Sequence, residues 1–575
     1  MTIPATGNHA SPAKHVMAGH ANDYVKRHAF AVCAILIWTL SAGAFLAFHD
    51  SMTTDEDIHI ASAYLALTRH DFRFDSEHPF LFKVITALPL LALHPNLPSD
   101  DQKDWKAAAP SYYDSWREAR EWSENWFYAS GNNAGLMILL ARIPAVLMLT
   151  LTVWLTYWIS RKWFGPDVAI WAMGIAAFNP MLIGHGHLAN TDIPLVTTFL
   201  IGVYAVWRYG ERPDITSALW FGLACLAAML SKFSGILLVP IFIIYAMFLS
   251  MRRRVESRKA LGHVGAAALL VYCGIWLAYL FKSQYVPGAP CLRSALNHLQ
   301  PLLQRHGHNL DQLAVFLAHI LPMQYLKAAF IHVDNAAVGR GTYLFGHEYR
   351  GGVWFYFPIL YLLKTPLVAL ALLAGGAWLT FKNKTGHSAH AVLGLSILVY
   401  LGIAMLNKLD IGIRHILPLF PLLSIYMAIG AVALVDRSRR LWVEPGLALM
   451  LALPVAAWFP SFINYSNVLV SPPSAAWRYY NDSNLDWGQD IKAIAAIVRA
   501  RFPSEPVYFN PRWSPYALSY YRVTSQPFDP ATPPHDGIAV LSATQLCDPA
   551  YAIFRNAHPA ASISNSTFIY MLGRR

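Results

Sequence analysis

Residues 29–57, AFAVCAILIWTLSAGAFLAFHDSMTTDED, place an acidic cluster directly after a long apolar run. The run from Phe30 to Phe48 has about the length of a membrane-spanning helix, which needs about 20 apolar residues. Asp55, Glu56 and Asp57 follow it closely. Because carboxylates are costly to hold next to hydrocarbon, their position at the end of a span indicates a functional site.

The composition extends the membrane assignment to most of the chain. Of 575 residues, 55% are hydrophobic and 13% are charged, and the mean hydropathy is +0.36. The net charge of +11 does not indicate nucleic-acid binding, because the basic residues occur in short loops between apolar runs. The sequence therefore predicts a mainly α-helical, polytopic membrane protein.

The apolar runs predict about eleven transmembrane helices, within a range of roughly 10–13. The shorter run 80–94 contains Lys83 and Pro89 and is expected to lie at the membrane surface. The predicted spans are 29–48, 134–158, 168–184, 191–209, 214–230, 233–250, 261–281, 353–380, 389–406, 411–435 and 441–461.

The Lys and Arg content of the short loops predicts the orientation of the chain in an inner (plasma) membrane. Residues 1–28 form a cytoplasmic segment, and the first run is interpreted as an uncleaved signal anchor. The transmembrane domain covers 29–461, with outer loops at 49–133 and 282–352. Residues 98–130, rich in Trp, are expected to form an amphipathic helical loop over the membrane. Residues 462–575 are expected to form a small outer α/β domain.

Ionisable residues gather in the loops on the predicted outer side. They come from many segments of the chain, so they predict a cavity at the membrane–water boundary. A path through the bilayer, as in a secondary transporter, would place them near the midplane instead. The candidates are Asp55, Glu56, Glu77, His78, Lys83, Asp192, Lys232, Arg350, Arg414 and His415.

Mixed acids and bases in such a cavity suit sugar transfer from a polyprenyl-phosphate lipid. A carboxylate (Asp55, Glu56 or Asp192) would deprotonate an acceptor hydroxyl. The others would bind the donor phosphate or the substrate, with Lys and Arg stabilising the charge of the leaving group. No P-loop or dinucleotide-binding glycine motif is present, and no cofactor is predicted. The histidine spacing gives no compact metal-ligand signature, so a divalent metal stays a minor alternative.

Each candidate also has a structural alternative. Asp192, followed by Pro194, could cap a helix, and Glu77 and His78 could cap another. The Lys and Arg candidates could extend to lipid headgroups. Cys291 and Cys547 could form a disulfide or remain thiols. At the level of the whole protein, the alternatives are a transporter or flippase and an oligosaccharide ligase.

Seven motifs, in their order along the chain, resemble those of bacterial family 39 glycosyltransferases. They are DE (55–56), EHPFLFK (77–83), NTDIPL (190–195), SKFSG (231–235), KTPL (364–367), GIRHILP (412–418) and DSNLDWGQD (482–490). The second motif departs from the family at Phe80, where a second proline is common. The Trp-rich stretch 98–130 matches no one subfamily.

This family, related to protein O-mannosyltransferases and lipid A aminoarabinose transferases, has the GT-C membrane fold. The resemblance implies a polyprenyl- or dolichyl-phosphate sugar donor and an inverting hexosyl (mannosyl) or pentosyl transfer. It places the family's first-loop acid on Asp55. The acceptor hydroxyl, on a protein, on lipid A or on another glycan, stays open.

Overall fold

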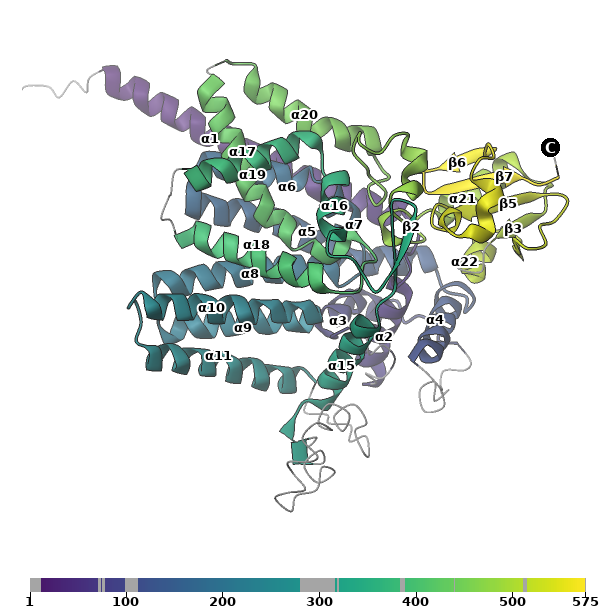
Figure 1. Ribbon diagram of the computed structural model, residues 1–575, viewed down its shortest axis with the longest axis horizontal. Coiled ribbons are helices and arrows are strands. Elements are labelled where there is room, and N and C mark those ends of the chain that lie inside the picture. Colours follow the sequence, from purple (N-terminus) through teal and green to yellow (C-terminus); the bar gives the residue numbers. More distant parts are fainter. Residues whose placement is uncertain are drawn as a thin grey trace, which may run out of the picture.

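A bundle of apolar helices carries a small sheet domain at one end (Figure 1). The computed structural model describes residues 12–70, 74, 78–98, 112–279, 316–317, 320–382, 388–438, 440–509 and 514–573. Two residues named above, Glu77 and Cys291, lie outside these ranges, as does part of the Trp-rich stretch.

The bundle contains every apolar run expected to span the membrane, each of them helical. Two 3-10 turns, η2 (Phe233–Leu237) and η4 (Ile413–Ile416), precede α10 and α19. The helices are α1 (Pro12–His49), α5 (Ala134–Phe164), α6 (Pro166–Ala177), α7 (Pro180–Gly186), α8 (Asp192–Glu211), α9 (Ile215–Ser231), α10 (Leu238–Met251), α11 (Ser257–Ala278), α16 (Tyr356–Leu363), α17 (Leu367–Lys382), α18 (Ser388–Leu406), α19 (Leu419–Ser438) and α20 (Val443–Trp458).

The mainly helical membrane fold is confirmed, but fewer helices than expected are long enough to span. Within the described ranges, seven helices are long and apolar enough to cross a membrane, or nine if each bent pair counts as one span. The expected count of about eleven also included α9 and α20, which are apolar but only 17 and 16 residues long.

Two of the spans are broken at residues that stop a helix. The pair α6 and α7 bends by 59° where Asn179 accepts hydrogen bonds from the backbone N–H groups of Met181 and Leu182. The pair α16 and α17 bends by 118° around Lys364–Pro366. Proline has no N–H to donate and disfavours helix in the residue before it, so the second break follows from the sequence. Each break leaves polar residues between helical segments.

Short elements crowd the end of the bundle that faces the sheet domain (Figure 1). The motif-bearing loops are among them, so this end holds the candidate site. The elements are α2 (Glu56–Arg69), α3 (Leu81–Ala87), η1 (Leu88–Ala92), α4 (Tyr112–Tyr128), α15 (Met323–Val338) and the antiparallel hairpin of β1 (Gly341–Leu344) and β2 (His347–Arg350).

The C-terminal domain is built on a five-stranded sheet in the order β4-β3-β5-β7-β6. The central strand β5 is buried along its whole length and pairs parallel with β3 and antiparallel with β7. Two helices and two 3-10 segments complete it. Its elements are α21 (Ile491–Arg501), β3 (Val507–Phe509), α22 (Pro515–Tyr520), β4 (Gln526–Pro527), β5 (Ile538–Ser542), η7 (Gln545–Cys547), η8 (Pro549–Phe554), β6 (Ala561–Ile563) and β7 (Thr567–Met571).

The segment 462–490 contacts both the bundle and the sheet domain, where the backbone N–H of Asp482 donates to Thr544 Oγ1 at 3.1 Å. It contains η5 (Pro473–Arg478) and η6 (Asp482–Asn484). The backbone N–H of Asn467 donates to the carbonyl of Leu363 at 2.9 Å, at the break between α16 and α17. The segment thus connects the bundle to the sheet domain, whose first helix is α21, and the boundary expected at 462 stays a prediction.

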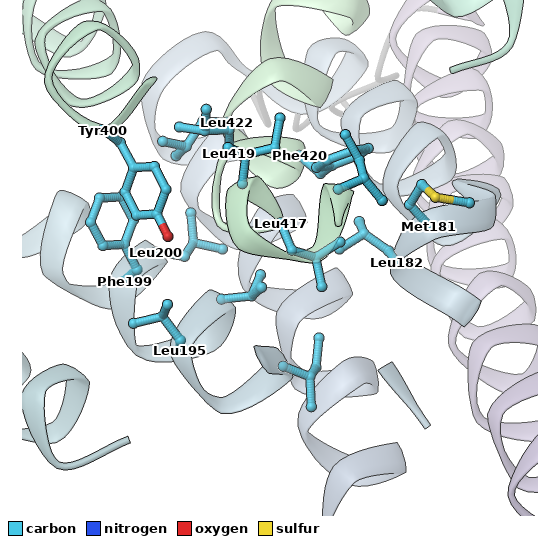
Figure 2. Packing of buried hydrophobic residues seen from close by; sticks show 14 of the residues in the cluster. Met181, Leu182, Leu195, Phe199, Leu200, Tyr400, Leu417, Leu419, Phe420 and Leu422 are labelled. Atoms are coloured by element: carbon cyan, nitrogen blue, oxygen red, sulfur yellow. The ribbon is translucent and has the colours of Figure 1, made fainter. Parts of the chain in front are cut away.

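Figure 2 shows a packed apolar core around the start of α19. Leu195, Phe199 and Leu200 of α8 lie with Leu417 and Phe420 around the start of α19, all at most 2% exposed. Between membrane helices, tight packing supplies most of the stabilisation, because lipid tails are as apolar as the core. This core fixes the helix ends that carry Asp192 and Arg414.

Candidate active site

Asp55 sits in a strained turn at the start of α2. Its backbone φ is 87°, in the left-handed region that non-glycine residues seldom adopt. Its side chain is 22% exposed, in contrast to the buried residues that follow it. Such strain persists only where the surroundings hold the backbone in place, and it is common at functional sites.

Glu56 holds this turn through a buried ion pair with Arg142 of α5. Its Oε1 accepts from Arg142 Nε at 2.9 Å and from the N–H of Ala189 at 2.7 Å. Its Oε2 accepts from Arg142 Nη2 at 2.7 Å and from the N–H of Thr53 at 2.8 Å. Both charged side chains are 0% exposed. The remaining guanidinium N–H groups donate to the carbonyls of Ala47, Asp50 and Ser51.

These contacts bear on the role expected for Glu56. Burial alone would raise the pKa of Glu56, but the charge and hydrogen bonds of Arg142 hold it below its ordinary range. The carboxylate is thus ionised, yet its lone pairs are already used and it has no exposed surface. In this arrangement the carboxylate has no free acceptor for a substrate proton and holds the turn of Asp55; the catalytic role expected from the sequence stays a prediction.

Four predicted residues form one series of alternating charges. Arg414 Nη2 lies 3.4 Å from Asp55 Oδ2, and Arg414 Nη1 lies 3.5 Å from Asp192 Oδ2. Lys232 Nζ lies 2.5 Å from Asp192 Oδ1. Asp192 is the first residue of α8 and its side chain does not cap the helix, since Thr191 occupies the capping position. The series Asp55–Arg414–Asp192–Lys232 therefore assembles a site from distant loops.

The segment 482–490 clamps both sides of this series. The ring of Trp487 lies 4.2 Å from the Arg414 guanidinium. The backbone carbonyl of Trp487 accepts a hydrogen bond from the N–H of Thr54 at 2.8 Å. Asn484 Oδ1 accepts from the N–H of Ile413 at 2.9 Å. Lys364, buried at the break between α16 and α17, donates to the carbonyl of Asn484 at 2.7 Å. The clamp fixes the turn of Asp55 and the turn of Arg414 relative to each other.

Asp490 closes the clamp onto the sheet domain. Its carboxylate accepts a hydrogen bond from Ser564 Oγ at 3.0 Å and another from Ser566 Oγ. Burial raises the pKa of Asp490 from 3.8 to about 7. Between these two pH values the folded state holds a proton that the unfolded state has lost. Stability is therefore lost as the pH rises through this window, and the loss is complete above about pH 7.

We expect Asp490→Asn to make the protein more stable than wild type at pH 8.5 and not at pH 5. The amide keeps an acceptor for one serine and has no charge to bury, so a few degrees of unfolding temperature should be gained at alkaline pH. Thermal unfolding of the purified protein in detergent at the two pH values measures this. An equal difference at both would show that ionisation of Asp490 is not responsible.

A large apolar cavity adjoins the charge series at Lys232 and His415. Its volume is about 970 Å³, and apolar side chains of α9, α10, α11, α15 and α18 form most of its wall. The polar residues in the wall are few and include His332, Asn407 and Lys408. The described residues thus enclose a space suited to a long apolar group with an anionic end.

Several buried polar atoms beside the series make no hydrogen bond within the described ranges. Buried polar groups are nearly always hydrogen-bonded, so a cluster of unsatisfied ones marks a place for water or a polar ligand. These atoms are Asn190 Nδ2, Asp192 Oδ2, Arg414 Nε, His415 Nε2 and both ring nitrogens of His185.

The other predicted residues are not part of the series. The His78 ring lies 6.2 Å from that of His332, at the wall of the cavity. Lys83 is 2% exposed within α3. Arg350 is exposed at the end of β2, opposite Gly341, and its phosphate-binding role stays a prediction. Glu77 lies outside the described residues.

Three important residues were not among the predicted ones: Arg142, Lys364 and Trp487. Each had a signal in the sequence. Arg142 and Lys364 are charged residues within apolar runs, where charges are rare and usually have a partner or a function. Trp487 lies inside the motif at 482–490.

The family model described as dolichyl-phosphate-mannose-protein mannosyltransferase matches residues 121–277. This stretch contains Arg142, Asp192 and Lys232, three of the charged residues described above. Over these residues the chain is similar to that family. The match agrees with the resemblance drawn from the motifs, although Asp55 and Arg414 lie outside the matched stretch.

Solved structures give distant similarities to this chain. ArnT from Cupriavidus metallidurans, bound to undecaprenyl phosphate, is 13% identical with a TM-score of 0.46, covering 94% of this chain and 97% of ArnT. The oligosaccharyltransferase AglB from Archaeoglobus fulgidus is 11% identical with a TM-score of 0.44, covering 86% of this chain and 63% of AglB. At these TM-scores the likeness adds nothing to the family match. No curated protein matches the chain.

Proposed function

We propose that this protein is a membrane glycosyltransferase that moves a sugar from a polyprenyl-phosphate donor to an acceptor hydroxyl. The observation that carries the proposal is the contact between the Asp55–Arg414–Asp192–Lys232 series and the 970 Å³ apolar cavity. The family match supports the same reaction class. The series lies at one end of the bundle, which favours an enzyme over a transporter with polar groups at midplane.

The donor occupies the cavity with its phosphate toward Lys232 and His415. An apolar wall suits the polyprenyl tail, and a cation suits the phosphate and the charge that develops on it as it leaves. Asp192 holds the Lys232 ammonium at 2.5 Å and so fixes where that charge is placed. The description of the matching family makes polyprenyl-phosphate mannose the first donor to test.

Asp55 is the general base in this proposal. It takes the proton of the acceptor hydroxyl as the hydroxyl oxygen bonds to the anomeric carbon of the sugar. The bond between that carbon and the phosphate oxygen breaks, and the polyprenyl phosphate leaves with both bonding electrons. Attack on the face opposite the leaving group inverts the anomeric configuration. Arg414, 3.4 Å from Asp55, orients the carboxylate while Trp487 fixes the guanidinium.

The reaction takes place at the outer face of an inner (plasma) membrane in this proposal. The turn between α10 and α11, which carries Arg252–Arg254, lies at the end of the bundle away from the sheet domain (Figure 1). Positively charged short loops favour the cytoplasmic side. The site and the sheet domain then face outward, where a protein, a lipid A or a glycan acceptor would approach.

Narrowing the cavity should weaken donor use. Ala329 of α15 lines the cavity, and we expect Ala329→Trp to raise the KM for a polyprenyl-phosphate mannose donor by roughly 10-fold, because the indole takes space needed by the tail. Transfer by the purified protein in nanodiscs measures this. Ala371→Trp, on an exposed face of α17, is the matched control.

Two results would count against the proposal. Equal KM values for Ala329→Trp and Ala371→Trp would show that the donor does not bind in the cavity. If the wild-type protein transferred no sugar from mannose-, hexose- or pentose-linked polyprenyl phosphates, and its loss from cells changed neither glycans nor lipid A by mass spectrometry, the glycosyltransferase assignment itself would fail.

A further inference from the structure

Helix α4 is attached to the turn of Asp55 by a partly buried arginine, Arg120. Arg120 Nε lies 3.5 Å from Asp57 Oδ2 and 3.0 Å from Glu124 Oε1. Asp57 and Glu124 are 2% and 6% exposed. Asp57 lies in the first turn of α2, two residues after Asp55. The contact therefore joins α4 to the chain beside the proposed base.

The helix is held on its other side by the sheet domain. The Tyr128 ring at the end of α4 lies 5.4 Å from the ring of Tyr520 in α22. The Trp126 ring, 0% exposed, lies 5.1 Å from that of Tyr64 in α2. Helix α4 is thus packed between α2 and the C-terminal domain, and it belongs to the Trp-rich stretch that no subfamily motif explains.

The electrostatics make Arg120 the critical residue of this contact. The charged groups that act on it are carboxylates: Asp57, Glu124 and, farther away, Asp55. Burial, helped by the charges of Glu124 and Asp55 and opposed by that of Arg120, raises the pKa of Asp57 to about 7. Without the guanidinium, two buried carboxylates on facing helices would repel each other, and α4 would separate from α2.

A water-sized cavity at the same contact shows how little room exists there. Its volume is about 20 Å³, and Thr54, Asp57, Arg120, Glu124 and Ser514 are in its wall. One water needs roughly 10–15 Å³ of such space. Thr54 precedes Asp55 directly and lines this cavity together with Arg120 and Glu124 of α4, so a shift of α4 displaces the strained turn as well.

We propose that Arg120 is a positioning residue, which docks α4 onto the turn of Asp55 and thereby fixes the carboxylate for acceptor activation. The inference rests on the proposed role of Asp55. Within the described ranges Arg120 does not line the 970 Å³ cavity and forms no ion pair with the charge series, so it acts on the rate and not on donor binding.

The test compares Arg120→Gln with Arg117→Gln, an exposed arginine on the same helix. We expect Arg120→Gln to lower kcat by roughly 10- to 100-fold, since small displacements of catalytic groups have effects of that size, with the donor KM within about twofold of wild type. Hydrogen–deuterium exchange should accelerate in residues 112–128 and 52–60. Arg117→Gln should change neither quantity.

Two further variants complete the test. Arg120→Lys should recover part of kcat. Arg120→Gln/Asp57→Asn, which leaves the Glu124 carboxylate with no second carboxylate facing it from α2, should restore slow exchange and most of kcat. If the double variant exchanges slowly and stays inactive, or if Arg120→Gln matches Arg117→Gln in both measurements, the positioning role is overturned. If the wild-type protein transferred no sugar and Arg120→Gln still exchanged faster than wild type at residues 52–60, the docking role of Arg120 would be supported and the proposed function would fail.

Discussion

Replacing Asp55 with asparagine should abolish sugar transfer and leave the protein folded in the membrane. The substitution removes the only group in the series with both an exposed carboxylate and an orientation set by Arg414. Loss of a general base typically lowers the rate by roughly 10²- to 10⁴-fold. The quantity to measure is single-turnover transfer with saturating donor.

Asparagine is the informative replacement because of the backbone at this position. Asn tolerates a positive φ at least as well as Asp, so Asp55→Asn keeps the turn at φ 87° without added strain. Asp55→Gly relaxes the backbone and should be equally inactive. Donor binding and unfolding temperature should match wild type in both variants. A fully active Asp55→Asn protein would show that another group takes the proton.

Arg142→Met should have the largest effect on stability. It leaves the Glu56 carboxylate buried without its cation and leaves three backbone carbonyls without their donor. Breaking a buried ion pair by removing one partner costs about 3–5 kcal/mol. We expect a much lower yield of folded protein and a marked fall in unfolding temperature in detergent.

The comparison variants separate this effect from the loss of any arginine in α5. Arg161→Met, at the exposed far end of the same helix, should behave like wild type. Glu56→Gln/Arg142→Met should be more stable than Arg142→Met alone, because no unpaired charge remains inside the protein. Equal stability of Arg142→Met and Arg161→Met would contradict the structural role of the Glu56–Arg142 pair.

The sequence allowed the helices and the members of the charge series to be predicted. Apolar runs locate membrane helices because the bilayer requires their length, and the charged residues between runs fall on alternating sides. That reasoning placed Asp55, Asp192, Lys232 and Arg414 on one face, and the structure brings the four together. The position of each residue along the chain was enough to predict its side of the membrane, because each of the four lies at the end of a helix.

The sequence did not show which of the two adjacent carboxylates, Asp55 or Glu56, is buried in an ion pair inside the protein. Asp55 and Glu56 are adjacent and chemically alike, yet only a partner 86 residues away, Arg142, decides that Glu56 is the buried one. The same holds for the boundary at 462. Nothing local in residues 462–490 distinguishes a domain linker from a segment that packs back onto the bundle, because its partners, such as Ile413 and Thr54, lie far away in the chain.

The clamp of residues 482–490 has a consequence for the biosynthesis of the protein. The turns of Asp55 and Arg414 receive their mutual placement from Trp487 and Asn484. Because this segment follows every described helix of the bundle in the chain, all of those helices must be synthesised before the two turns receive this placement. The helices can pack early, but the turns of Asp55 and Arg414 are fixed relative to each other only near the end of synthesis.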